Sequence, residues 1–120
     1  MTRTDAELIV DEYHRAWTSG DVERAMTYVA DDIVCRAPGA DLTGKEAYGD
    51  FIAGFAPSLV GIADIATFAD GDRVALFYYP QTATTTTAPA AECFTIRAGK
   101  IAESVLLFDR LSFGPPEGRR

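Results

Sequence analysis

The sequence is poor in the side chains that build metal and redox sites. His14 is the only histidine, and the two cysteines, Cys35 and Cys93, lie in separate segments rather than in a Cys-x-x-Cys pair. The glycine-rich patterns of dinucleotide and phosphate sites are missing, as is the Gly-x-Ser-x-Gly pattern of serine hydrolases. We therefore expect no metal and no cofactor, and we expect both cysteines to be free thiols.

Long apolar runs and an excess of basic residues are missing as well. No run approaches the roughly 18 apolar residues of a membrane span, and the segment Met1 to Glu7 is too polar for a secretory signal. Eleven Lys and Arg residues against 18 Asp and Glu give a formal net charge of −7, which does not favour binding to nucleic acid or to an anionic membrane. We expect a cytoplasmic protein.

What is present is the composition of one globular domain, with 48% hydrophobic residues in 120. Helical periodicity and caps predict three helices, and strand patterns between turn residues predict the rest. The predicted helices run from the capping box Thr4–Glu7 to Thr18, from Val22 to about Asp31, and from a second capping box at Thr43–Glu46 to about Ala56. The predicted strands are Ile33–Ala37, Leu59–Phe68, Arg73–Thr85, Ala91–Arg97 and Ile101–Phe113.

This order, helices first and an antiparallel meander after them, is typical of an α+β fold with helices on one face of a sheet. The predicted strands are apolar on both faces, whereas helices can cover only one. We therefore expect the outer face of the sheet to meet a second copy of the chain in a homodimer. The alternative is a sheet that twists far enough to wrap its own core.

One carboxylate stands out in the last predicted strand. Asp109 lies between Phe108 and Leu111 in an almost wholly apolar run, and strand alternation places it on the same face as Val105 and Leu107. A carboxyl group among apolar neighbours is costly unless it is paired or protonated, and such a setting raises its pKa toward values useful in proton transfer. The alternative is an exposed Asp109 that turns outward at the end of the strand.

Four short motifs are spread along the chain between Ala6 and Phe113. They are Tyr13-x-x-x-Trp17-x-x-Gly20-Asp21, Ala30-Asp31-Asp32, Leu42-Thr43-Gly44-Lys45-Glu46-Ala47 and Ile96-Arg97-Ala98-Gly99-Lys100-Ile101. Together they resemble the SnoaL-like polyketide cyclases and ketosteroid isomerases of the nuclear transport factor 2-like superfamily. The resemblance implies a cone-shaped, strongly curved antiparallel sheet whose three N-terminal helices enclose an apolar cavity. It covers a single SnoaL-like domain, residues 1–113, followed by a loose tail, residues 114–120.

The resemblance also implies roles for three residues. Asp109, eight residues after Ile101, matches an acid/base aspartate of the cyclases. Tyr13 matches an oxyanion-stabilising tyrosine of the isomerases, and Glu92 falls near their second oxyanion donor, a carboxylic acid kept protonated. A row of aromatic residues is expected to wall the cavity and contact a substrate: Trp17, Tyr28, Phe51, Phe55 and Phe94.

Each of these residues also has a structural interpretation. Tyr13 can be a core tyrosine, Glu92 an edge-strand glutamate and the aromatic residues ordinary core. His14 points about 100° away from Tyr13 on the helix, and we expect it at the flank or surface. The isomerase base, an Asp before a Pro, is missing, because the chain reads Cys35-Arg36-Ala37-Pro38 there.

We therefore expect a cofactor-free enzyme, a SnoaL-like cyclase or isomerase that uses general acid/base proton transfer on a small apolar carbonyl compound. Three alternatives stay open. The chain could be a non-catalytic ligand-binding member of the superfamily, or a dimerisation module with a filled core. It could also be an epoxide hydrolase of the limonene type, if Arg36 or Arg110 bridges Asp109 or Glu92.

Overall fold

The computed structural model describes residues 4–113, apart from the side chain of Asp64. The predicted tail, residues 114–120, lies outside the described residues. The helices are α1 (Asp5–Thr18), α2 (Val22–Met26), α3 (Lys45–Phe55) and the 3-10 turn η1 (Ala56–Ser58). The strands are β1 (Val29–Ala37), β2 (Ala40–Thr43), β3 (Leu59–Asp70), β4 (Arg73–Thr82), β5 (Ala90–Arg97) and β6 (Lys100–Phe108).

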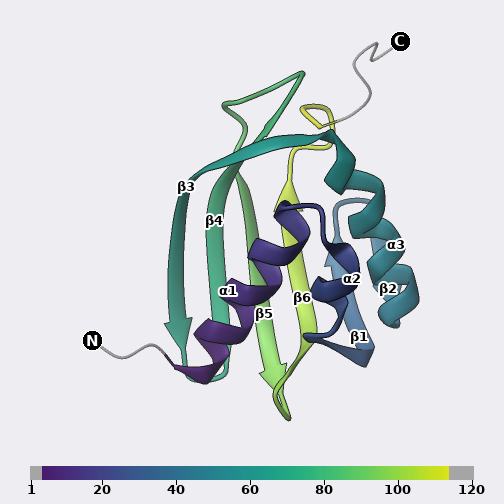
Figure 1. Ribbon diagram of the computed structural model, residues 1–120, viewed down its shortest axis with the longest axis vertical. Helices are drawn as coiled ribbons and strands as arrows, with labels where there is room; N and C mark the ends of the chain where they lie inside the picture. The colour runs from purple at the N-terminus through teal and green to yellow at the C-terminus, as the bar shows by residue number, and fades with distance from the viewer. Residues whose placement is uncertain (1–3, 114–120) are drawn as a thin grey trace.

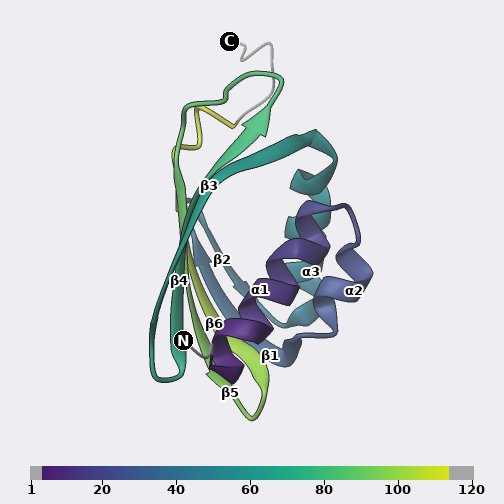
Figure 2. The same cartoon turned by 60° about the vertical axis from the view of Figure 1, so that its left-hand side comes forward.

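The strands form one sheet in the order β2-β1-β6-β5-β4-β3, with free edges at β2 and β3. Figure 1 shows α1, α2 and α3 in front of this sheet, and Figure 2 shows that the sheet curves around them on that one side. The predicted α+β fold with a strongly curved sheet and three N-terminal helices is confirmed. The sheet is mostly antiparallel rather than wholly so, because β1 runs parallel to β6.

Helix α1 begins where the sequence predicts, because Thr4 and Glu7 form a capping box. The Thr4 hydroxyl accepts from the Glu7 backbone N–H at 3.1 Å, and the Glu7 carboxylate accepts from the Thr4 N–H at 2.8 Å. The second predicted capping box is wrong. Helix α3 begins after Gly44, at φ 95°, with no side-chain cap, because Thr43 belongs to β2 and pairs with Val34. The short strand β2 was not predicted.

Several predicted boundaries are wrong because neighbouring strands decide them. Helix α2 ends at Met26 rather than near Asp31, since the chain from Val29 onward pairs with β6. Strand β6 ends at Phe108 rather than Phe113, since its last partner in β5 is Ala90. Strand β4 likewise ends at Thr82 rather than Thr85.

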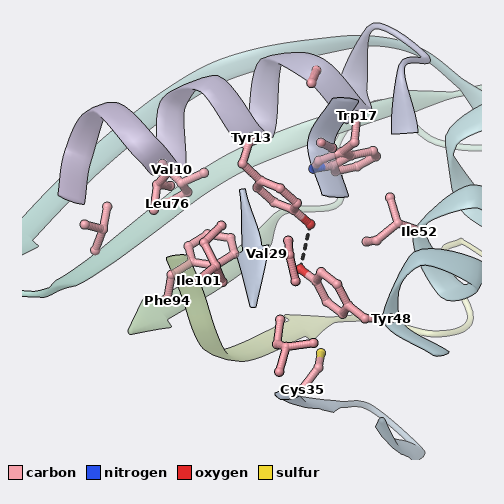
Figure 3. Packing of buried hydrophobic residues seen from close by; sticks show 14 of the residues in the cluster. Val10, Tyr13, Trp17, Val29, Cys35, Tyr48, Ile52, Leu76, Phe94 and Ile101 are labelled. Atoms are coloured by element: carbon pink, nitrogen blue, oxygen red, sulfur yellow. Dashed lines mark hydrogen bonds between the residues drawn. The ribbon is translucent and has the colours of Figure 1, made fainter. Parts of the chain in front are cut away.

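The core lies between α1, α3 and the inner face of the sheet (Figure 3). Its largest fully buried side chains include Trp17, Tyr13, Tyr48 and Phe94. Within residues 4–113, no helix has both the length and the hydropathy to span a bilayer.

The opposite face of the sheet carries large apolar side chains in the open. Strand β6 alternates between buried and exposed positions from Ala102 to Leu107, and the rings of Phe68 and Phe77 meet edge to face with centroids 5.9 Å apart. We call this surface the outer apolar face. It is formed by Val34, Phe68, Phe77, Val105 and Leu107, which are 38–61% exposed.

Candidate functional site

A pocket of about 280 Å³ lies between the helices and the inner face of the sheet; we call it the inner pocket. Its deep wall is built of buried residues, and its rim is built of partly or fully exposed ones. The deep wall consists of Trp17, Ile52, Tyr78, Pro80, Ala90, Glu92 and Leu106, and the rim consists of Phe51, Gly54, Phe55, Phe108 and Phe113. The lining is therefore almost wholly apolar and aromatic, which suits a small apolar molecule.

Glu92 is the only carboxylate that the described part of the chain contributes to this lining. Strand alternation in β5 turns it inward together with Phe94 and Ile96, so that its side chain is only 2% exposed. One carboxyl oxygen, Oε1, is buried with no hydrogen-bond partner among residues 4–113. Burial raises the pKa of Glu92 to about 8, although a hydrogen bond with Tyr78 acts in the opposite direction. At neutral pH the carboxyl group is therefore mainly protonated and able to donate a hydrogen bond.

Tyrosine hydroxyls surround this carboxyl group. The Tyr13 and Tyr48 oxygens are 2.6 Å apart in a hydrogen bond (Figure 3). Burial, together with the nearby Glu92, holds the pKa of both tyrosines well above the usual value. The Ser104 hydroxyl lies close enough to lower the pKa of Tyr48 and of Cys35, yet no hydrogen bond of good geometry reaches it. Glu92 thus faces neutral donors rather than a cation.

The only histidine lies beside the same pocket, which corrects the expectation of a flank or surface position. His14 is 4% exposed. Its ring meets the rings of Tyr78 and Trp17 edge to face, with centroids 4.5 Å and 5.5 Å away. Burial lowers its pKa to about 4, so His14 is a neutral packing residue above that pH. Its Nε2 atom and the indole Nε1 of Trp17 are buried, and neither has a hydrogen-bond partner within the described residues.

The structure brings together some of the predicted site residues and not others. Trp17, Phe51, Phe55 and Glu92 line the inner pocket. Tyr13 lies outside the lining, in the core, where its ring meets that of Phe94 edge to face at 5.6 Å. Tyr28 lies in the turn just before β1 and is partly buried; its carbonyl oxygen accepts from the Ile101 N–H.

Asp109 lies outside the pocket. It follows the end of β6, is exposed, and uses its carboxylate within a local turn. One oxygen accepts from the Leu111 N–H at 3.2 Å, and the other accepts from the Ser112 hydroxyl at 2.7 Å. The prediction that Asp109 occupies the last strand is wrong, and the structure does not bring it to a common pocket with Tyr13.

The arginines considered for a carboxylate-bridging role also lie elsewhere. Arg36 pairs with Asp41 at 3.3 Å on exposed strand positions, and Arg110 packs against Gly39. Among residues 4–113, no three His, Cys, Asp or Glu side chains gather as a metal site would require.

A wider and shallower hollow of about 930 Å³ lies between α2 and α3. The carboxylates that line this hollow are all exposed: Glu23, Asp31, Glu46 and Asp50. The buried carboxyl group suited to acid/base chemistry is therefore Glu92, in the inner pocket.

Comparison with solved structures finds the same fold in many proteins. A protein from Kribbella flavida DSM 17836 is 39% identical, with 88% of this chain and 87% of that chain covered and a TM-score of 0.83. A "putative polyketide cyclase" from Xanthomonas campestris pv. campestris is 22% identical over 88% and 90% of the two chains, with a TM-score of 0.75. TerC, co-crystallized with polyporic acid, is 21% identical over 92% and 95%, with a TM-score of 0.75.

Comparison with curated protein sequences finds no match. The profile of the SnoaL-like domain, in contrast, matches residues 10–104, a segment that runs from the middle of α1 into β6 and includes Glu92. This match spans most of the described fold, and it agrees with the motifs noted in the sequence. The chain belongs to the SnoaL-like domain family.

Proposed function

We propose that this chain is a cofactor-free enzyme that moves a proton on a small apolar carbonyl compound held in the inner pocket, as an isomerase or cyclase. The observation that carries the proposal is Glu92, a buried carboxyl group with a free oxygen in an apolar aromatic pocket. Perturbed carboxyl groups of this kind in a pocket mark candidate acid/base residues. The cyclase name of one structural relative agrees with such a reaction class.

The chemistry follows from the pKa of Glu92, about 8. At pH 7 about a tenth of the molecules carry an ionised Glu92. This carboxylate takes a proton from the carbon next to the substrate carbonyl, so that a C–H bond breaks and an O–H bond forms on Glu92. As Glu92 gains this proton, the Tyr78 hydroxyl turns from its hydrogen bond with Glu92 and donates to the carbonyl oxygen, where negative charge develops. Protonated Glu92 then returns the proton to the same carbon or to another carbon of the conjugated system.

This proposal assigns acid/base work to Glu92 and not to Asp109, because Asp109 is exposed and lies outside the pocket. Tyr13 and Tyr48 form a second layer behind Glu92, where burial and the nearby Glu92 keep both hydroxyls protonated. The competing function is ligand binding without turnover. It is favoured by the presence of a single carboxylate in the pocket lining.

The proposal can be tested with 2-tetralone, an apolar bicyclic ketone with exchangeable protons beside its carbonyl. Wild-type protein should quench the fluorescence of Trp17, the only tryptophan, on binding 2-tetralone. It should also speed the exchange of these protons for deuterium in D₂O, followed by NMR, above the rate in buffer. Binding of 2-tetralone without faster exchange would support the non-catalytic function. If the protein neither bound 2-tetralone nor sped the exchange, both the enzymatic and the ligand-binding function would be contradicted.

Filling the pocket should remove both signals. Ala90 is buried in the pocket wall, so Ala90→Phe places a ring in the space that a ligand needs. We expect the Ala90→Phe variant to bind 2-tetralone about tenfold more weakly or worse. Because the ring enters an open pocket, its free energy of unfolding should fall by less than the roughly 1–3 kcal/mol that overpacking a filled core costs. Ala53→Phe, at an exposed position of α3, is the matched control. Unchanged binding in Ala90→Phe would place the ligand elsewhere.

We further propose that the chain forms a homodimer through the outer apolar face. Two ion pairs flank this face within the chain: Arg97 with Glu103 at 3.2 Å and Arg36 with Asp41 at 3.3 Å. Arg73 also lies beside it, with its guanidinium 3.8 Å from the Cys93 sulfur. The face therefore presents mainly apolar surface with charged residues around it, which fits a second copy of itself.

Light scattering after size exclusion should give wild-type protein about twice the chain mass of 13.0 kDa. Leu107→Asp should give the single-chain mass, because a charge would be buried without a partner. The matched control is Leu8→Asp, which changes an exposed leucine on α1, in the helical layer. A monomeric wild type, or a Leu107→Asp variant that remains a dimer, would contradict the proposed interface.

A further inference from the structure

Residues Asp109–Phe113 form a turn directly after β6, which we call the Asp109 turn (yellow, above β6 in Figure 1). We infer that Asp109 is a positioning residue, whose carboxylate holds Phe113 at the rim of the inner pocket, and that Phe113 controls how small molecules reach Trp17. The inference rests on the proposed function for the ligand that enters the pocket, but it requires no reaction there.

The Asp109 turn is held together mainly by Asp109 itself. Besides its two carboxylate hydrogen bonds, to the Leu111 N–H and to the Ser112 hydroxyl, its carbonyl oxygen accepts from the Ser112 N–H at 3.1 Å. Such side-chain bonds to residues two and three positions onward fix a turn. The Thr84 hydroxyl adds a longer bond of 3.4 Å to the Ser112 carbonyl, from the loop between β4 and β5. The residue next to these bonded positions is Phe113.

Phe113 connects the helical layer to the sheet at the rim. Its ring meets Phe55 of α3 and Phe108 of β6 edge to face, each with centroids 5.9 Å apart. Phe55 in turn contacts Trp17, with centroids 6.0 Å apart. An aromatic row thus runs from the partly exposed Phe113 inward to Trp17, which is 2% exposed. Removing the outermost ring should open the pocket without disturbing the deep wall.

This arrangement gives Asp109 a role that acts through another residue. Its two carboxylate hydrogen bonds go to Leu111 and Ser112, which do not line the pocket but belong to the turn that ends at Phe113. If Asp109 positions Phe113, loss of the carboxylate should matter only while Phe113 is present. If Asp109 instead only stabilised the end of β6, loss of its carboxylate would have the same effect with and without the Phe113 ring.

The first test needs no ligand. Acrylamide is a small neutral quencher, and Trp17 is the only tryptophan, so quenching of its fluorescence reports entry into the pocket. We expect Phe113→Ala and Asp109→Ala each to raise the quenching constant about two- to threefold, and the double variant to match Phe113→Ala alone. Asp109→Asn keeps an acceptor for the Leu111 N–H and should restore part of the protection. Leu111→Ala, at a position 93% exposed in the same turn, is the matched control.

The second test measures the dissociation rate of 2-tetralone by stopped-flow recovery of Trp17 fluorescence. Asp109→Ala and Phe113→Ala should release it about tenfold faster, again without addition in the double variant. Unchanged acrylamide quenching in both single variants, or equal effects of Asp109→Ala with and without Phe113, would overturn the inference. Failure of the proposed function is distinguishable, because it would appear as absent proton exchange while acrylamide quenching still responds to Asp109 and Phe113.

Discussion

Replacing Glu92 by glutamine is expected to slow the protein-dependent deuterium exchange of 2-tetralone at least about 100-fold, since a positioned acid/base group contributes about 10²–10⁴ in rate. Glutamine has nearly the same shape and can donate a hydrogen bond, but it can neither take nor return a proton. Binding of 2-tetralone, measured by Trp17 fluorescence, should change much less than the rate of exchange.

The pH dependence of this exchange carries independent information. Because the ionised form of Glu92 removes the proton, the wild-type rate should rise with pH and level off above its pKa of about 8. Glu103→Gln is the matched control: it removes a carboxylate whose side chain is 55% exposed on the neighbouring strand, and it should leave rate and pH profile unchanged. Glu92→Gln with the wild-type rate would assign the proton transfer to another group.

The second large effect of Glu92→Gln concerns stability. In the window between the ordinary glutamate pKa of 4.5 and the raised pKa of about 8, the folded protein holds a proton that the unfolded chain has released. The free energy of unfolding therefore falls as pH rises, by about 1.4 kcal/mol per pH unit where Glu92 alone contributes. The stabilisation is fully present below the ordinary pKa and is lost as the pH approaches 8.

His14 acts in the opposite direction in the acidic part of this window. Its pKa is lowered from 6.5 to about 4, so the unfolded chain binds the extra proton and the free energy of unfolding rises with pH up to about 6.5. The two effects offset one another below pH 6.5, and the fall due to Glu92 stands alone above it. Between pH 6.5 and 8 the wild type should lose roughly 1–2 kcal/mol.

Urea unfolding at a series of pH values measures this difference. Glu92→Gln should remove most of the fall between pH 6.5 and 8, and at pH 8 it should be the more stable protein. Glu103→Gln should retain the wild-type slope, because its carboxylate is in contact with solvent before and after unfolding. Parallel slopes for wild type and Glu92→Gln would show that burial does not shift the titration of Glu92.

The features that could be predicted from the sequence are those set by residues close together in the chain. The capping box at Thr4 forms as predicted, because its hydrogen bonds involve residues only three positions apart. The inward position of Glu92 follows from alternation along β5, which holds for any strand with one buried face. Tyr48 was missed, although its spacing of four residues from Ile52 places both on the buried side of α3.

Features that depend on distant partners could not be predicted in this way. The end of β6 depends on where β5 begins, so nothing near Asp109 indicates that the strand stops before it. The burial of His14 depends on Tyr78, which lies 64 positions further along the chain and packs against its ring. Asp109 is unusual for its neighbours in the sequence, but its surroundings in space are solvent and its own turn.

The protonation state of Glu92 is the central claim, and carbon-detected NMR of its side-chain carboxyl group tests it most directly. The Glu92 carboxyl signal can be assigned by its absence from the spectrum of Glu92→Gln. Its titration should have a midpoint near pH 8, because burial in the inner pocket raises its pKa to about 8. A midpoint near 4.5, the ordinary value for glutamate, would contradict both the neutral acid in the pocket and the proton transfer built on it.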